Sequence, residues 1–191
     1  MNTESVKEQL TRKRVLLLRG DVTEQAVEEV RVRMVTLALE STEEIILAID
    51  TKGGVNVPSL WLVDTMRLIS APVKGIVNGR CFSAGVMILQ GCTTRVATRH
   101  SSFYLHHVHG TFPYSLRQND AQIKARLAED LREAREQDKQ VRDLLSKRSG
   151  QSRQTVTVLI NEGEKINRFY TALEAKKLGF VDKVIDSCEL F

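Results

Sequence analysis

Short apolar runs alternate with amphipathic segments along the first half of the chain. The apolar runs lie at residues 15–18, 45–49 and 73–77. The segments between them carry apolar residues at helical spacing, namely Val27, Val30, Met34 and Leu37 in the first and Leu60, Val63, Met66 and Ile69 in the second. Repeated strand and helix signals predict an α/β fold with mostly parallel pairing, because parallel neighbours need a crossover between them.

Local signals mark the ends of several elements. The stretch from Asp21 to Glu24 resembles a capping box with Asp21 as the cap. Residues 50–54 read Asp-Thr-Lys-Gly-Gly and predict a flexible turn after the second strand. Further short strands are expected at residues 94–97, 103–106 and 180–185. A short helix is expected from Thr171, with Gly179 as its stop.

A different pattern begins at about residue 120 and continues to 147. A heptad-like stripe is formed by Ile123, Leu127, Leu131, Ala134, Val141 and Leu145. Asp138 interrupts this stripe where an apolar residue would continue it. The pattern predicts one amphipathic helix of about 40 Å at 1.5 Å per residue. Such a helix is expected to project and pack against a neighbouring subunit. The alternative is a helix that lies across its own domain.

Composition bounds the class of protein. A chain of 191 residues with 42% apolar and 27% charged residues is typical of one soluble domain, so residues 1–191 are expected to form a single domain. The net charge of +4 without a basic stripe argues against nucleic-acid binding. No run reaches a membrane span, and the N-terminus has no apolar leader, so a cytoplasmic location is expected. Three cysteines, Cys81, Cys92 and Cys188, are expected to be reduced thiols.

Ser83 is the candidate nucleophile. It lies in Gly-Arg-Cys-Phe-Ser-Ala-Gly, residues 79–85, between a strand-like run and an apolar helix-like run. Free N–H groups and the dipole at a helix N-terminus favour negative charge, as an acyl-transfer intermediate requires. The alternative is a serine that only caps the helix. His106 follows 23 positions later and could act as a base, or could be a core histidine bound to a backbone group.

The histidines also invite a metal hypothesis. His106, His107 and His109 lie close together, but in a strand His106 would point away from the other two. The next acidic side chain after them is Asp120, and no cysteine lies nearby. The sequence therefore favours a site without metal.

Several motifs occur in a specific order over nearly the whole chain, from about residue 14 to 185. They are Gly53-Gly54 after a strand, Asp64-Thr65-Met66, Gly79-x-x-x-Ser83-x-Gly85, Ser101, His106, Asn167-Arg168-Phe169, Glu174-Ala175 and Gly179-Phe180-Val181-Asp182. This combination resembles the proteolytic subunit family of the Clp protease, serine peptidases of the Clp-protease/crotonase fold. The resemblance implies a head of repeated ββα units at about 12–105 and 165–188, and a protruding handle at about 106–150. It also implies heptameric rings stacked as a tetradecamer around a closed chamber.

The resemblance assigns roles residue by residue. It implies that Ser83 is the nucleophile and His106 the general base, with the N–H groups of Gly54 and Ala84 as the oxyanion hole. The triad orienter falls at Asn167, where the family pattern has Asp. An Asn carbonyl can accept the bond from His Nδ1–H but carries no charge to stabilise the imidazolium. Activity is therefore expected to be low, conditional on assembly or absent.

Other departures concern the handle and the N-terminus. The segments from His106 to Gly150 and from Gly150 to Asn167 are longer than the family pattern, and Val108 stands where Pro is usual. The N-terminus resembles a shortened form, which implies reduced axial loops for contact with an ATPase.

The leading hypothesis is an ATP-dependent Clp-type serine endopeptidase that hydrolyses unfolded proteins or peptides through an acyl-enzyme at Ser83. It implies no cofactor, since ATP would be used only by a partner Clp ATPase. A second hypothesis is a structural subunit of the same ring with little or no activity. A third is a crotonase-type acyl-CoA enzyme, because Pro72-Val73-x-x-Ile76-Val77-Asn78-Gly79 also resembles that related fold.

Overall fold

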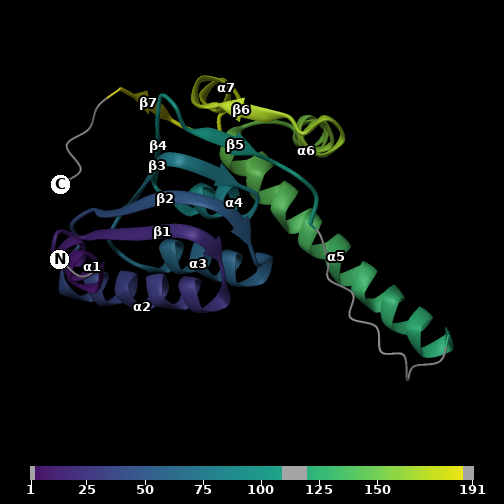
Figure 1. Ribbon diagram of the computed structural model, residues 1–191, viewed down its shortest axis with the longest axis horizontal. Helices are drawn as coiled ribbons and strands as arrows, with labels where there is room; N and C mark the ends of the chain where they lie inside the picture. Colours follow the sequence, from purple (N-terminus) through teal and green to yellow (C-terminus); the bar gives the residue numbers. More distant parts are fainter. Residues whose placement is uncertain (1–2, 109–119, 187–191) are drawn as a thin grey trace.

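The three apolar runs of the sequence form three adjacent strands of one sheet (Figure 1). The computed structural model describes residues 3–108 and 120–186. Within these residues, seven strands form one sheet with the main order β1-β2-β3-β4-β7. The bounds of these five strands are β1 Val15–Val22, β2 Ile45–Gly54, β3 Val73–Phe82, β4 Thr94–Thr98 and β7 Lys183–Ile185. All neighbours on this path pair in parallel, which confirms the predicted α/β fold.

One helix precedes the first strand, and further helices connect the parallel strands. The first four are α1 Thr3–Arg12, α2 Glu24–Glu40, α3 Asn56–Leu68 and α4 Ala84–Gly91. Helix α2 buries the predicted apolar face of Val27, Val30, Met34 and Leu37. Its cap is Thr23, whose hydroxyl accepts a bond from the N–H of Ala26 at 3.1 Å. The prediction of Asp21 as cap is wrong, because β1 continues through Asp21 and pairs it with Gly53.

The predicted turn at residues 50–54 is instead the end of strand β2. The pairing of β2 with β3 shifts register between Ile49 and Thr51. At this irregularity Asp50 accepts hydrogen bonds from the backbone N–H of Arg80 at 3.0 Å and from its Nε at 2.9 Å. Gly53 and Gly54 remain part of the sheet because they pair with Asp21 and Val22 of β1. They lie at the C-terminal end of β2.

Strand β3 belongs to two parts of the sheet. Its first half pairs with β4, and residues Arg80, Cys81 and Phe82 pair with β5 (Ser102–Tyr104). Strand β6 (Phe169–Thr171) then pairs antiparallel with β5. Strand β6 was not predicted from the sequence, and β5 ends at Tyr104 rather than at the predicted residue 106. Helix α7, Ala172–Lys177, follows β6 and starts with a capping box of Thr171 and Glu174.

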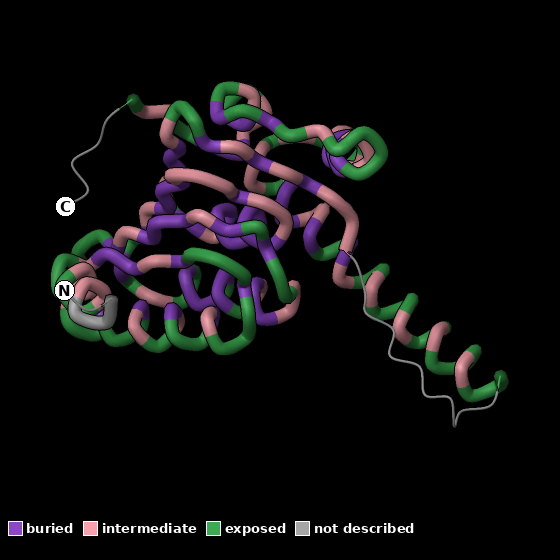
Figure 2. Tube along the Cα trace, viewed as in Figure 1, coloured by how far each residue is buried: buried purple, intermediate pink, exposed green. Residues whose placement is uncertain are grey.

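The predicted long helix is α5, Asp120–Ser149. Only its C-terminal part contributes buried side chains, from Asp138, Val141, Leu144 and Leu145. The N-terminal part extends away from the sheet and is largely exposed (Figures 1 and 2). Helix α6, Arg153–Ile166, packs on α5. Among the described helices, none is long and apolar enough to cross a membrane.

Candidate active site

The Ser83 turn joins β3 to α4, as the sequence predicts. Ser83 has φ 52° and ψ −120°, a region that favours glycine, so a side chain here stores strain of about 1–3 kcal/mol. Its N–H donates to the carbonyl of Tyr104 at 2.8 Å, and its carbonyl accepts from the N–H of Val86 at 2.9 Å. Within the described residues its side chain makes no capping bond to α4. The geometry thus argues against the alternative that Ser83 is only a helix cap.

Two glycines let the end of β2 approach this turn. A Cβ on Gly53, at φ 96°, would lie 2.6 Å from the Cβ of Ser83. A Cβ on Gly85 would lie 2.6 Å from Cγ2 of buried Thr51. The Thr51 hydroxyl in turn accepts the N–H of Gly53 at 2.9 Å. The Ser-x-Gly and Gly-Gly motifs are therefore two sides of one close backbone contact.

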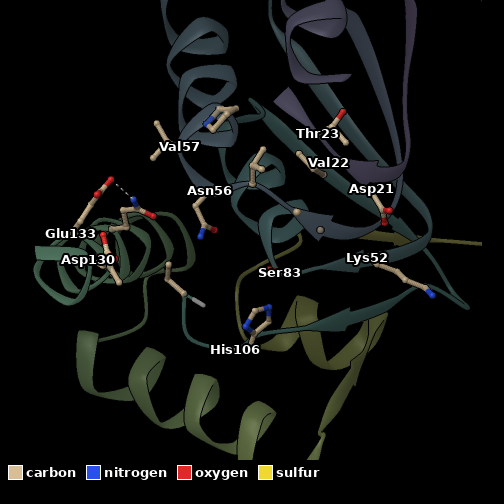
Figure 3. A pocket seen from close by; sticks show the side chains of 17 residues that line it. Asp21, Val22, Thr23, Lys52, Asn56, Val57, Ser83, His106, Asp130 and Glu133 are labelled. Atoms are coloured by element: carbon tan, nitrogen blue, oxygen red, sulfur yellow. Dashed lines mark hydrogen bonds between the residues drawn. The ribbon is translucent and has the colours of Figure 1, made fainter. Parts of the chain in front are cut away.

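His106 reaches the same place from the neighbouring strand. Because β3 and β5 run parallel with Phe82 opposite Tyr104, Ser83 and His106 both lie just beyond the strand ends. Both line an open cleft of about 860 Å³, together with Gly53 and Gly54 (Figure 3). The half-buried His106 ring lies beside Tyr104, with ring centroids 5.5 Å apart. The two residues predicted as nucleophile and base therefore line one cavity.

Of the two predicted oxyanion donors, Gly54 lines the cleft, and Ala84 is buried directly after the cleft residue Ser83. Gly54 is exposed at the end of β2 and lines the cleft, and a Cβ there would overlap the carbonyl oxygen of Val22. Ala84 is the first residue of α4, a position whose N–H has no acceptor within its own helix. A Cβ placed on Gly53 would lie 3.1 Å from the N atom of Ala84, so the two backbone segments are adjacent. Their role as an oxyanion hole remains a prediction.

Asn167 lies apart from the cleft. It is the C-cap of α6 in the left-handed conformation, with φ 49° and ψ 44°, and its N–H donates to the carbonyl of Gly163. Its side chain is exposed and is not among the described residues that line the cleft. Asn adopts the left-handed backbone conformation more readily than most residues, so the helix cap alone is a structural reason for Asn at this position. Its predicted role as orienter of His106 remains a prediction.

An aromatic cluster connects the segments that carry the three predicted catalytic residues. Phe82 precedes Ser83, Tyr104 precedes His106 by two residues, and Phe169 follows Asn167 by two residues. The ring centroids of Phe169 lie 5.3 Å from Phe82 and 5.1 Å from Tyr104. Such tilted pairs contribute about 0.5–1.5 kcal/mol beyond burial. The cluster holds the ends of β3, β5 and β6 together beside the cleft.

Helix α5 forms the opposite wall of the cleft, a role that was not predicted from the sequence. Asp130, Glu133, Ala134 and Gln137 line it from α5. Figure 3 shows Asp130 and Glu133 on the side of the cleft away from Ser83 and His106. The signal was present in the sequence, because these positions share one helical face at spacings of three and four. Lys52 and Asp21 add charges of opposite sign at the other end.

Both ring nitrogens of His107, one of the histidines in the metal hypothesis, face hydrogen-bond partners instead of a metal site. Its Nδ1 lies 3.1 Å from Oδ1 of Asp138, and its Nε2 lies 2.8 Å from Oδ1 of Asn161. Among the described residues, no group of three or more His, Cys, Asp or Glu side chains is arranged to hold a metal ion. His109, the third histidine of the hypothesis, lies outside the described residues. The expected absence of a metal stays a prediction.

Buried Cys81, two residues before Ser83, is not a rival nucleophile. It has no exposed surface, and burial raises the pKa of its thiol well above the ordinary value. The reactive thiolate is therefore disfavoured at neutral pH. Cys92 is also buried, and burial raises the pKa of its thiol to about 12.

Comparison with known proteins connects this site to a family. The model of the Clp protease family matches residues 1–188. The ATP-dependent Clp protease proteolytic subunit of Streptococcus uberis is 28% identical over 184 residues, which cover 95% of this chain and 89% of that protein. The ATP-dependent Clp protease proteolytic subunit 1 of Leifsonia xyli subsp. xyli is 27% identical, covering 97% and 90%. The subunit 1 of Streptomyces avermitilis is 29% identical, covering 95% and 79%. The family match extends over nearly the whole chain and includes the serine turn, the histidine and the paired glycines, so the chain belongs to the Clp protease family.

Proposed function

We propose that this chain is a serine peptidase subunit that hydrolyses peptide bonds through an acyl-enzyme at Ser83. The observation that carries the proposal is the strained Ser83 turn, which shares one cleft with His106 and Gly54. Family membership supports the reaction class, because the relatives described above are named proteolytic subunits.

The first half of the reaction forms the acyl-enzyme. The Ser83 oxygen attacks the scissile carbonyl while the His106 imidazole takes the hydroxyl proton. The carbonyl oxygen becomes an oxyanion, and the N–H groups of Gly54 and Ala84 donate to it. When the C–N bond breaks, His106 returns its proton to the leaving amine.

The second half releases the acyl group. A water molecule loses a proton to His106 and attacks the ester carbonyl, and the same two N–H groups stabilise the second oxyanion. The C–O bond to Ser83 then breaks, and the serine oxygen recovers a proton from His106. Every proton and bond is accounted for by the chain and water, so this route requires no metal or organic cofactor.

Asn167 supports a second candidate function. A serine nucleophile normally relies on a carboxylate to orient the histidine and stabilise its charged form. With Asn at this position, the subunit would be weakly active, or would serve assembly alone in the same ring. The exposed position of the Asn167 side chain at the end of α6 is compatible with either function.

The cleft suits extended peptide segments of mixed character. Its lining combines the backbone of the β2 end with apolar Val22, Val57 and Ala134 and with charged side chains on α5. Pairing of a peptide with the strand-like edge would read its backbone and tolerate different side chains. We therefore propose unfolded proteins or short peptides as substrates, and we disfavour the acyl-CoA alternative because the family match is to Clp protease.

We also propose assembly into heptameric rings that stack as a tetradecamer, with a Clp ATPase as the partner that uses ATP, in the cytoplasm. Support comes from exposed apolar side chains on α2 and α3, where Val32, Leu39, Trp61 and Leu68 are 44–86% exposed. Large exposed apolar groups of this kind are typical of subunit interfaces.

The proposal can be tested by covalent labelling. Fluorophosphonate treatment followed by peptide mass mapping should modify Ser83 in fractions whose native mass matches the assembled particle, and Ser83→Ala should abolish both label and peptidase activity. Ser101 is an internal reference, because it is 3% exposed and its hydroxyl donates to the carbonyl of Val77 at 2.8 Å. Labelling at Ser101 or Ser102 with unmodified Ser83 would contradict the assignment. Ring-sized particles without label or hydrolysis would favour the structural role.

A further inference from the structure

Asp138 is a carboxylate within the apolar stripe of α5. Its side chain is 12% exposed, at a helix position where burial of an apolar residue would be expected. Its Oδ1 lies 3.1 Å from Nδ1 of His107 and 3.3 Å from the backbone N of Val108, and its Oδ2 accepts from Arg142. A charge at such a position is tolerated only when it is paired and hydrogen-bonded. The partners show that Asp138 fixes the two residues directly after His106.

The same histidine also contacts α6. Nε2 of His107 lies 2.8 Å from Oδ1 of Asn161. Two residues further along α6, a Cβ on Gly163 would overlap the carbonyl oxygen of Leu105, so α6 touches the backbone just before His106. Leu105, His107 and Val108 are therefore each held by α5 or α6. The backbone of His106 lies between these fixed points, while its side chain faces the cleft with Ser83.

We propose that His107, Asp138 and Asn161 form a clamp that positions His106 as the base, and that this clamp couples α5 to the reactivity of Ser83. The inference rests on the proposed function, since it assigns a purpose to contacts around the proposed base. All three are positioning residues: none of them is among the described residues that line the main cleft. Val108 does line that cleft, so release of its N–H from Asp138 would also alter the wall beside His106.

The charges around His107 make the clamp sensitive to pH. Burial lowers its pKa, but hydrogen bonds to Asn161 and Asp138, and the negative charges of Asp138 and Glu164, outweigh burial and raise the pKa above the ordinary value. On α5, Arg142 opposes this effect by pairing with Asp138. Nδ1 of His107 faces a carboxylate oxygen of Asp138, and Nε2 faces the amide oxygen of Asn161. Both ring nitrogens can therefore donate hydrogen bonds only when His107 is protonated.

The direction of the pH dependence follows from the raised pKa. The clamp is complete below the pKa that His107 has in the unfolded chain, and its charged contribution is lost as pH rises through the folded pKa. We therefore expect the contribution of the clamp to kcat to be lost as the pH rises through the folded pKa of His107.

The test compares His107→Gln, Asp138→Asn and Asp138→Leu with a control on the same helix, Glu136→Gln. Glu136 forms an exposed ion pair with Lys139, and neither residue lines the cleft among the described residues. Each assembled variant is assayed for kcat and KM on a fluorogenic peptide across pH, for the rate of fluorophosphonate labelling at Ser83, and for hydrogen exchange of peptides covering residues 105–108. Asp138→Leu restores the apolar stripe, so a loss of activity there cannot be attributed to a lost core contact.

In Asp138→Leu, kcat and the labelling rate should fall by about 10²-fold with little change in KM, the effect expected for a misplaced catalytic group. Exchange at residues 105–108 should become faster. Asp138→Asn, which keeps an acceptor, should lose less. In His107→Gln the fall of kcat at high pH should disappear, and Glu136→Gln should match the unmodified chain. If Asp138→Leu does not assemble, His107→Gln and Asp138→Asn carry the test.

Two negative results can be told apart. If the unmodified chain labels at Ser83 and the His107 and Asp138 variants keep its labelling rate, kcat and pH profile, the clamp does not position the base and the inference is overturned. If the unmodified particle does not label at Ser83 although residues 105–108 are protected, the proposed function fails, and the inference fails with it because no base is being positioned.

Discussion

The backbone N–H of Ser83 donates a hydrogen bond of 2.8 Å to the carbonyl oxygen of Tyr104. This bond continues the parallel pairing of β3 with β5 by one residue beyond Phe82. It therefore sets the distance along the sheet between the serine turn and His106, which follows Tyr104 by two residues. The position of the proposed nucleophile relative to its base thus depends on backbone pairing, and the side chains need only complete the geometry.

Because the backbone of Ser83 is strained, a glycine at this position should stabilise the folded protein while it abolishes activity. Ser83→Gly and Ser83→Ala should both abolish hydrolysis. Glycine relieves about 1–3 kcal/mol of strain at this φ and ψ but adds about 0.5–1 kcal/mol of entropy to the unfolded chain. Ser83→Gly should therefore be more stable than Ser83→Ala by about 1 kcal/mol in denaturant unfolding of assembled protein. Equal stability of the two variants would contradict strain at this residue.

Gly53→Ala should impair the site through a direct clash. The added Cβ would lie 2.6 Å from the Cβ of Ser83 and 2.8 Å from the carbonyl oxygen of Phe82, so the serine turn must move. We expect loss of fluorophosphonate labelling by about 10²-fold or more, as for other misplaced reacting groups. Gly20→Ala is the matched control, because Gly20 has φ 79° but no atom within 4 Å of an added Cβ. If both variants lost labelling to the same extent, backbone strain, and not the clash with Ser83, would account for the loss.

Asn167→Asp should increase peptide hydrolysis if Asn167 is the orienter of His106. A carboxylate would stabilise the imidazolium formed during attack, and in a Ser-His-Asp protease the reverse change lowers kcat by about 10⁴-fold, which is an upper bound here. The measurement is kcat on a short peptide, with Asn167→Asp in a Ser83→Ala background as the control for contaminating protease. No increase in an intact ring would support the structural function instead.

The Arg95–Asp182 pair predicts acid sensitivity of the fold. Burial raises the pKa of Asp182, but its hydrogen bonds from the N–H and guanidinium of Arg95 and the charge of Arg95 outweigh burial and hold that pKa below the ordinary value. Arg95 itself is 6% exposed and also donates to the carbonyl oxygens of Arg148 and Gly179. Because the folded pKa is depressed, the stabilisation is present above about pH 4 and is lost as pH falls through the folded pKa.

Asp182→Asn should therefore lower the melting temperature at pH 7. In this variant the melting temperature should also fall less steeply as the pH is lowered from about 5 to 3. The control is Asp186→Asn, since Asp186 pairs with Arg99 on an exposed surface and should affect stability much less. Thermal unfolding at several pH values checks both. If the two variants gave the same pH dependence, the buried arginine would not be the source of the effect.

Much of the architecture could be predicted from the sequence, because its signals are local. Helix α2 has its predicted face, α5 has the predicted length and stripe, and Ser83 lies where an apolar strand meets an apolar helix. Each pattern repeats over a few residues, so periodicity alone identifies it. The position of His106 made it a candidate base, but only the family resemblance favoured that role over a core histidine, since a single histidine has no local signature.

Tertiary structure decided the features that depend on distant partners. Gly53 and Gly54 have the composition of a turn but belong to a strand, because β1 pairs with them. Strand β6 has only three residues and exists through its pairing with β5. Asp138 looks like a defect in an apolar stripe, yet it is bound by His107, 31 residues away in the chain, which also contacts Asn161, 54 residues away. Such contacts arise only when the sheet and helices pack, so no local pattern could have predicted them.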